Sequence, residues 1–141
     1  MSSAPSILAR VKVLAIDYGR ARTGVAVSDP TGTLARPVAV IERVESESGL
    51  AQLQELIAAE EPERIVVGLP LTLTGERGAQ VLETDRFIQK LRATAQVPVE
   101  MFDERFTTIL AGPSEPGRPD DARAAAVLLT SYLTWLTRQA R

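Results

Sequence analysis

Short apolar runs separated by polar segments set the pattern of this chain, and the first three of them predict strands. The runs are Val11–Asp17, Gly24–Val27 and Pro37–Ile41, each short and rich in small or β-branched residues. Runs of this length bounded by glycine, proline or charged residues are typical of buried strands. Because only a few residues separate the first two, we expect a hairpin that turns through Arg20-Ala21-Arg22.

Helical and strand patterns alternate in the rest of the chain. Apolar residues recur at helical spacing over Leu50–Ile57 and again in a later segment. The expected apolar side of this second helix consists of Val81, Leu82, Phe87, Ile88 and Leu91. The continuous apolar runs Arg64–Gly68 and Val97–Phe102 predict two more buried strands. A last helix is expected from Pro119-Asp120 to about Gln139.

The predicted element order is βββαβαβα. Three tightly connected strands, followed by strands and helices in alternation, indicate an α/β fold with a mixed five-stranded sheet flanked by helices. The length of 141 residues, of which 45% are hydrophobic, fits a single domain with its own core. We expect this domain to span residues 1–141, with residues 1–10 as a flexible N-terminal tail.

Chemically distinctive residues stand at the ends of three predicted strands. Asp17 ends the first strand, Gly68 ends the fourth, and Asp103-Glu104 follow the fifth. In open α/β sheets ligands bind beyond the carboxyl ends of the parallel strands, so we expect these positions to converge on one edge. Gly68 could line a site there or simply end its strand. Asp29 ends a strand at the other end of the hairpin, so we interpret it as a turn residue.

Composition excludes several kinds of chemistry. The chain has no cysteine and no histidine, which rules out disulfides, thiolate or imidazole metal ligands, and nucleophile pairs that need histidine. The formal charge is −2 and the sequence pI is about 5.2, so no general basic field attracts nucleic acid, and such a partner would need a local patch. Chemistry therefore rests on carboxylates, hydroxyls, arginines, lysines and the backbone.

The acids at the strand ends and at the start of the last helix suggest a metal site. Carboxylates gathered in one site repel one another unless a cation lies between them. Mg²⁺ or Mn²⁺ is the expected cofactor, because both prefer oxygen ligands and neither requires histidine. Two such ions can activate a water and stabilise the leaving oxygen of a phosphodiester. The expected metal ligands and catalytic acids are Asp17, Glu104 and Asp121.

Each of these acids also has a purely structural interpretation. Asp17 could be a turn residue or a helix cap. The segment Asp103-Glu104-Arg105 could be a solvated loop with a local ion pair. Asp120-Asp121 could be the cap and first turn of a helix, where acids are favoured by the helix dipole. The functional interpretation depends on the joint placement of the acids.

Helical spacing distinguishes the two adjacent acids at the start of the last helix. Asp120 is the expected N-cap, whereas Asp121 lies about 100° further round the helix axis. Asp121 is thereby in line with the side expected to face the sheet, which consists of Ala125, Leu128 and Tyr132. On the same helix, we interpret Tyr132 and Trp135 as core aromatics rather than as platforms for base stacking.

Four sequence blocks resemble the signature blocks of the YqgF family. They are DYGRARTGVAVSD (17–29), VVGLPLTLTGERG (66–78), FDERFTT (102–108) and DARAAAVLLTSYL (121–133). Members of this family have a ribonuclease H-like fold and are described as Holliday-junction resolvases or pre-16S ribosomal RNA nucleases. The resemblance implies the same fold for this chain. It also implies that the catalytic acids are Asp17, Glu104 and Asp121.

The resemblance also concerns the basic residues, and it implies that Arg22 and Arg105 fill the family's basic positions. The turn at Asp17-Tyr18-Gly19 could contact a phosphate, because glycine lets phosphate approach backbone N–H groups. The same glycine could equally serve the hairpin. The expected nucleic-acid contacts are Gly19, Arg20, Arg22, Arg105 and Arg118.

The chain departs from the family pattern at three places. Where the family often has a lysine before the arginine of the first block, this chain has Ala21, with Arg20 one position earlier. The second block reads Thr72-Leu73-Thr74-Gly75 in place of Asn-x-Asp before its glycine. The segment Gly112–Pro119 is short and proline-rich where the family has a longer, lysine-rich one, and Arg118 is its one basic residue. These departures affect the expected binding of nucleic acid and leave the expected catalytic carboxylates in place.

Three classes of function are compatible with these features. The first is a metal-dependent nuclease acting on structured RNA or branched DNA, in 5′-end processing of pre-16S rRNA or as a Holliday-junction resolvase in recombination and repair. The second is an actin-like phosphotransferase, which shares a D-x-G turn, although 141 residues lack the second half-domain that closes over a nucleotide. The third is a weakly catalytic, nucleic-acid-binding assembly factor.

The chain shows no pattern of a signal peptide or of a membrane span. We therefore expect a cytoplasmic protein that does not bind membranes. The sequence leaves a homodimer open.

Overall fold

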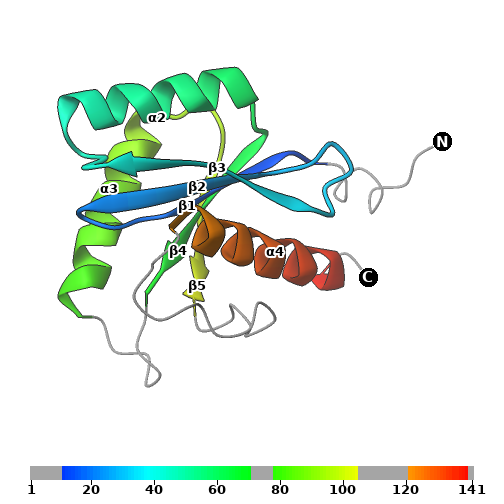
Figure 1. The fold of residues 1–141 in the computed structure, drawn as a ribbon. Coiled ribbons are helices and arrows are strands. Elements are labelled where there is room, and N and C mark those ends of the chain that lie inside the picture. Colours follow the sequence, from blue (N-terminus) through cyan, green and yellow to red (C-terminus); the bar gives the residue numbers. More distant parts are fainter. Residues whose placement is uncertain (1–10, 71–77, 105–120, 140–141) are drawn as a thin grey trace.

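A mixed sheet of five strands forms the centre of the computed structural model, which describes residues 11–70, 78–104 and 121–139 (Figure 1). The strand order within these ranges is β3-β2-β1-β4-β5. Strand β2 runs antiparallel to β1 and β3, whereas β4 runs parallel to β1 and β5. The strands are β1 Val13–Asp17, β2 Arg22–Ser28, β3 Ala35–Glu42, β4 Arg64–Leu69 and β5 Val99–Asp103.

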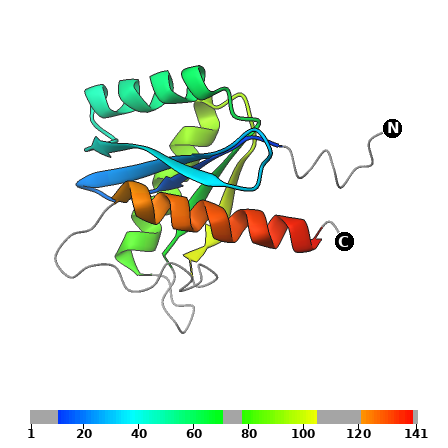
Figure 2. The ribbon, with the colours of Figure 1, turned by 45° about the vertical axis from the view of Figure 1, so that its right-hand side comes forward.

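Helices of the described ranges cover both faces of this sheet. They are α2 Glu47–Glu60, α3 Ala79–Thr94 and α4 Asp121–Gln139. Helices α2 and α3 pack on one face, here called the helix-pair face, and α4 crosses the other, the α4 face (Figures 1 and 2). None of the described helices is long and apolar enough to cross a membrane.

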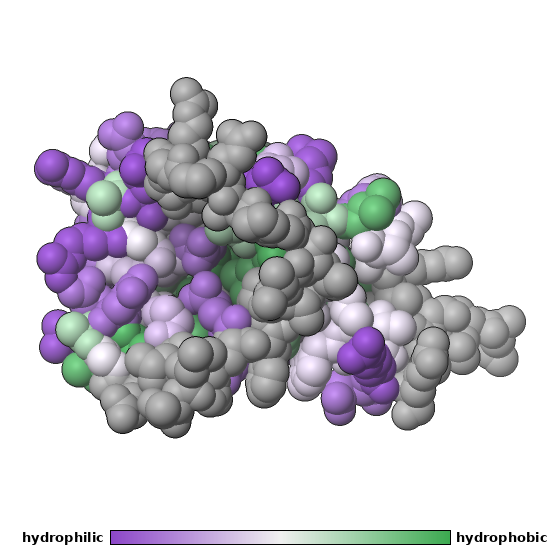
Figure 3. All heavy atoms as spheres, turned by 60° about the horizontal axis from the view of Figure 1, so that its bottom comes forward, coloured by the Kyte–Doolittle hydropathy of each residue, from purple (hydrophilic) through white to green (hydrophobic). Residues whose placement is uncertain are grey.

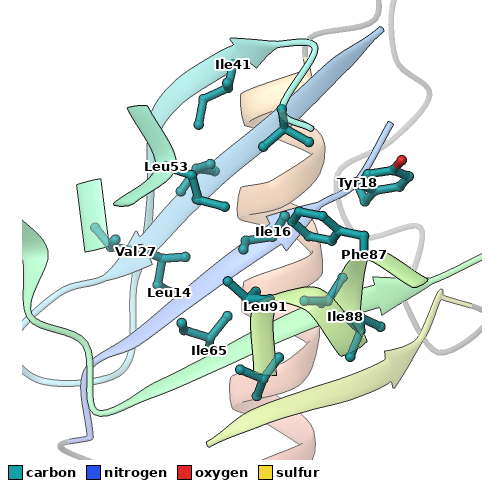
Figure 4. Close-up of a cluster of buried hydrophobic side chains, with 14 residues drawn as sticks. Leu14, Ile16, Tyr18, Val27, Ile41, Leu53, Ile65, Phe87, Ile88 and Leu91 are labelled. Atoms are coloured by element: carbon teal, nitrogen blue, oxygen red, sulfur yellow. The ribbon is translucent and has the colours of Figure 1, made fainter. Parts of the chain in front are cut away.

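The alternation of side chains along β1 divides the core between the two faces. Its even-numbered side chains, together with Tyr18, join the hydrophobic cluster formed with α2 and α3 (Figure 4). Val13 and Ala15 join the second cluster, formed with α4. Because successive side chains of a strand point to opposite faces, Asp17 belongs to the α4 face and its neighbour Tyr18 to the helix-pair face.

The predicted element order and the mixed sheet are confirmed, with boundaries shifted by a few residues. Helix α2 begins earlier than its apolar pattern indicates, because Ser46 caps it. The Ser46 hydroxyl accepts a hydrogen bond from the Gly49 N–H at 3.0 Å. The predicted loop after β4 falls partly on residues 71–77, outside the described residues.

Two of the expected core positions are wrong. Leu82 is 50% exposed, because α3 buries a narrow stripe that includes Val81 and Phe87, and position 82 lies about 100° away from that of Val81. Trp135 is 41% exposed, whereas Tyr132 is buried as expected. The Trp135 ring lies near Phe102 and Tyr132, at centroid distances of 6.0 Å and 5.9 Å.

Gly49 provides a test of how α2 is seated on the sheet. A Cβ at this position would lie 2.2 Å from the carbonyl oxygen of Arg43 and 2.7 Å from the Cα of Val44. Gly→Ala in a helix normally stabilises by about 1 kcal/mol. Here we expect Gly49→Ala to destabilise by at least about 2 kcal/mol, since the clashing atoms are backbone. Urea unfolding measures the change.

The control for this experiment is Gly78→Ala at the start of α3. A Cβ there would meet nothing within 4 Å. We expect this variant to unfold within about 1 kcal/mol of the parent chain. A Gly49→Ala protein as stable as the parent would show that α2 is not held against the backbone of residues 43–44.

Candidate active site

Asp17 stands at the carboxyl end of β1 and is half-buried. The neighbouring parallel strands end at the same edge, because Ile16 of β1 is aligned with Val67 of β4 and Leu69 of β4 with Asp103 of β5. The predicted convergence of strand ends is therefore confirmed. We call this place the acidic edge.

Glu104 follows β5 directly and lies, half-buried, against Gly68 of β4. Its burial, and then the negative charges of Asp17 and Asp103, raise the pKa of the Glu104 carboxyl from 4.5 to about 7. The interaction with Asp17 connects the ends of two strands that are far apart in the sequence. The alternative of a solvated loop over Asp103-Glu104-Arg105 does not fit the half-buried Glu104 or Asp103, which ends β5, whereas Arg105 lies outside the described residues.

Gly68 makes room for Glu104. A Cβ at this position would lie 3.0 Å from Cγ and 3.1 Å from Cδ of Glu104, and 3.1 Å from a methyl carbon of Leu128. Any side chain at position 68 would thus press on both Glu104 and α4. The sequence alone leaves the role of this glycine open, although a glycine near the end of a strand of isoleucine and valine indicates a close approach by another group.

Helix α4 runs antiparallel to β4 and brings its first turn toward the acidic edge. Leu128 packs at Gly68, near the carboxyl end of β4, whereas Tyr132, one turn later, accepts a hydrogen bond of 2.9 Å from Arg64 at the start of that strand. Asp121 begins the helix. The positions in line with Asp121 are buried, as predicted: Ala125, Leu128 and Tyr132. The Asp121 side chain and all of Asp120 lie outside the described residues.

The acids at this edge are the groups of the site that could hold a metal ion. Among the side chains that the structure describes, no three acids are close enough together to form a metal site. Asp17 and Glu104 supply two carboxylates whose charges interact. The third ligand expected from the sequence is Asp121, so the complete triad stays a prediction.

The turn between β1 and β2 separates the predicted nucleic-acid contacts. The side chains of Val25 and Val27 in β2 point to the helix-pair face, so the alternation places Arg22 on the α4 face. Arg20 instead pairs with Glu83 of α3, on the helix-pair face. Two further predicted contacts, Arg105 and Arg118, lie outside the described residues.

Gly19 is needed by the hairpin itself. A Cβ there would lie 2.3 Å from the carbonyl oxygen of Arg22. The Gly19 N–H donates to the Thr23 hydroxyl at 3.2 Å, and this hydroxyl donates back to the Gly19 carbonyl at 3.0 Å. Local geometry thus explains the glycine, and its contact with phosphate stays a prediction.

Asp29 is a turn residue, as expected. Its carboxylate accepts hydrogen bonds from the N–H groups of Thr33 and Leu34, each at 3.0 Å, and from the Thr31 hydroxyl at 2.6 Å. These bonds, that from Thr31 first, lower the pKa of Asp29. Asp29 therefore serves the β2–β3 turn.

The raised pKa of Glu104 predicts how stability depends on pH. The folded chain holds the Glu104 proton up to about pH 7, whereas the unfolded chain releases it near 4.5. In the presence of chelator, the free energy of unfolding should therefore fall as pH rises between these values. Glu104→Gln removes this loss and should be more stable than the parent at pH 8 by up to about 3 kcal/mol.

Thermal melting of both proteins from pH 4 to pH 8 measures this effect. The matched control is Glu55→Gln on the exposed side of α2, whose melting curves should follow those of the parent. Curves for Glu104→Gln that stay parallel to those of the parent across the whole range would show that Glu104 titrates as an ordinary surface acid.

Comparison of the sequence with known proteins identifies the family. The family model RuvX, described as "Holliday junction resolvase", matches residues 11–135. A protein of Chloroflexus aggregans named "Putative pre-16S rRNA nuclease" is 38% identical over 130 residues, covering 86% of this chain and 92% of that protein. A protein of the same name from Streptomyces coelicolor is 40% identical over 129 residues, covering 85% and 77%.

Comparison of the structure confirms the expected ribonuclease H-like fold. The chain is similar to the structure entitled "T. thermophilus RuvC in complex with Holliday junction substrate", with a TM-score of 0.63 and 18% identity. The similarity covers 92% of this chain and 96% of that one. The family match extends over nearly the whole chain, and the fold agrees with it. The chain belongs to the RuvX family, which is described as Holliday junction resolvase.

Proposed function

We propose that this chain is a metal-dependent nuclease that hydrolyses phosphodiester bonds in structured nucleic acid, with Asp17, Glu104 and Asp121 as its catalytic acids. The observation that carries the proposal is the half-buried Glu104 carboxyl, whose pKa is raised by burial and by Asp17. Two interacting acids in a partly buried place oppose folding, so stability does not explain them. Such a pair is typical of a functional site that binds a cation.

The donor groups at the acidic edge fit a hard divalent cation. Carboxylate oxygens are the ligands that Mg²⁺ and Mn²⁺ prefer, and the chain has no histidine or cysteine to favour a softer metal. Asp17, Glu104 and Asp121 would hold the cation. When bound, such ions activate a water molecule and stabilise the leaving oxygen of a phosphodiester.

The residues of the chain supply position and charge for this chemistry. Gly68 leaves room for the stem of Glu104 to lie against β4, and the Glu104 carboxyl interacts with Asp17 at the end of β1. Partial burial strengthens the attraction between these carboxylates and a cation, because fewer water dipoles screen it. Arg22 is exposed on the same face as Asp17, and its guanidinium would bind a phosphate next to the cleaved bond.

Precursor 16S rRNA is the substrate that we propose, cleaved at its 5′ end during ribosome biogenesis, which takes place in the cytoplasm of bacteria. Two relatives that share 38% and 40% identity with this chain are named "Putative pre-16S rRNA nuclease", and each alignment covers most of both sequences. Holliday-junction DNA is the second candidate substrate, supported by the description of the family model. Cleavage of the two substrates side by side distinguishes them.

Glu104→Gln tests the chemistry directly. Glutamine keeps the size of the side chain but removes the charge of the ligand, so cleavage should fall at least about 100-fold. Binding of the uncut substrate should change little. Cleavage of a labelled pre-16S rRNA 5′ fragment and of a four-way DNA junction is measured with Mg²⁺, with Mn²⁺ and with chelator. The control Glu55→Gln should cleave as the parent does, and full activity in excess chelator would contradict a metal mechanism.

Asp121→Asn tests the third ligand, with Asp120→Asn as its matched control. Asn at position 120 can still cap the helix, so that variant should keep its cleavage rate. Asn at position 121 removes a ligand charge on the line of the buried helix face, so cleavage should be lost while thermal stability is kept or rises. The opposite result, with Asp120→Asn inactive and Asp121→Asn active, would shift the predicted ligand by one residue.

A further inference from the structure

A hollow of about 260 Å³ lies between the β1–β2 turn and α3, on the helix-pair side of the acidic edge. It is lined by Arg20, Glu45, Glu83, Arg86 and Lys90. These side chains come from the turn after β1, from the segment before α2 and from α3. Hydrophilic side chains gather on the left of Figure 3, the side where Figure 1 places α3 and the β1–β2 turn.

Tyr18, the residue after Asp17, contacts one of the side chains that line this hollow, Glu45. Its buried ring stacks on Phe87 of α3 at a centroid distance of 4.7 Å (Figure 4). Its hydroxyl donates a hydrogen bond of 2.5 Å to Glu45, which also pairs with Lys90 at 3.2 Å. Tyr18 therefore links the hollow to the end of the strand that carries the first of the proposed catalytic acids.

The charges in the hollow are only partly balanced. Three cationic side chains face two carboxylates, in a chain whose net charge is −2. Arg20 reaches Glu83 through Nε at 3.3 Å and also through its terminal nitrogen, but the Arg20 side chain is 80% exposed. Exposed ion pairs of this kind contribute little to stability, so a phosphate can replace Glu83 as the partner of Arg20 at low cost.

We propose that this hollow is a second phosphate-binding site for the nucleic-acid substrate, formed by Arg20, Arg86 and Lys90. In the absence of substrate, Glu83 forms an ion pair with Arg20, and a phosphate of the substrate replaces it. The proposal rests on the nuclease function proposed above. It adds a place where the nucleic-acid strand is bound after it leaves the acidic edge. Arg20 is three residues from Asp17, at most about 10 Å of extended chain. About three nucleotides of a duplex strand span that distance.

The two classes of side chain in the hollow should have opposite effects on binding. Arg86→Ala and Lys90→Ala remove phosphate contacts, so each should weaken binding about 3- to 10-fold and reduce the steepness of its salt dependence by about one unit. Glu83→Gln removes the competitor for Arg20, so it should tighten binding about 2- to 5-fold. A merely structural role for the Arg20–Glu83 pair predicts no gain in affinity.

Affinity is measured between 50 and 200 mM salt for a fluorescent pre-16S rRNA 5′ fragment and a four-way DNA junction. All variants are made in a Glu104→Gln background so that the substrate stays uncut. The matched controls are Arg36→Ala, an exposed arginine at the start of β3, and Glu55→Gln on the exposed side of α2. Both controls should bind within about 2-fold of the parent.

If the parent binds the substrate and the Arg86→Ala, Lys90→Ala double variant binds it with the same affinity and the same salt dependence, the second site is overturned. The proposed nuclease function is not affected by that result. Weaker binding by Glu83→Gln would overturn the second site as well. If the parent binds neither nucleic acid, the proposed function and the second site fall together. Melting temperatures within a few degrees of the parent establish that the variants are folded.

Discussion

The half-buried carboxylate of Glu104 beside a second acid is the constraint on which the rest of the site depends. Burial and the charges of Asp17 and Asp103 raise the pKa of Glu104 to about 7, so its ionised form opposes folding near neutral pH. The position of Glu104 also requires a glycine at position 68, because a Cβ there would press on the Glu104 stem. The closely packed hydrophobic clusters on the two faces of the sheet stabilise the fold and offset the unfavourable free energy of the half-buried acids.

The period of two along β1 and β2 assigns neighbouring residues to different tasks. Asp17 points to the α4 face and takes part in the acidic edge, whereas Tyr18 points to the helix-pair face and anchors the strand end on α3. The turn then separates Arg22 from Arg20 in the same way. In the proposed nuclease, this one hairpin would supply both a catalytic acid and contacts to the substrate, because its two faces lead to opposite sides of the sheet.

Local patterns predicted a large part of this structure and failed where a residue's surroundings matter more than its type. The apolar runs identified all five strands of the described residues, and helical spacing placed Tyr132 in the core. Leu82 was placed on the apolar side of its helix and Trp135 was interpreted as a core aromatic, yet both are substantially exposed. Which apolar side chains of a helix are covered depends on how the helix is rotated against its sheet, and adjacent residues differ by about 100°.

The sequence by itself determined the element order, the acids at the strand ends and the exclusion of histidine and cysteine chemistry, because these follow from residue types and short-range periods. Only the tertiary structure decided that Glu104 lies against Gly68 and interacts with Asp17. It also decided that Arg20 and Arg22 lie on opposite faces of the sheet. These contacts join segments up to about ninety residues apart. They depend on which strands pair and in what register, and no local pattern encodes that pairing.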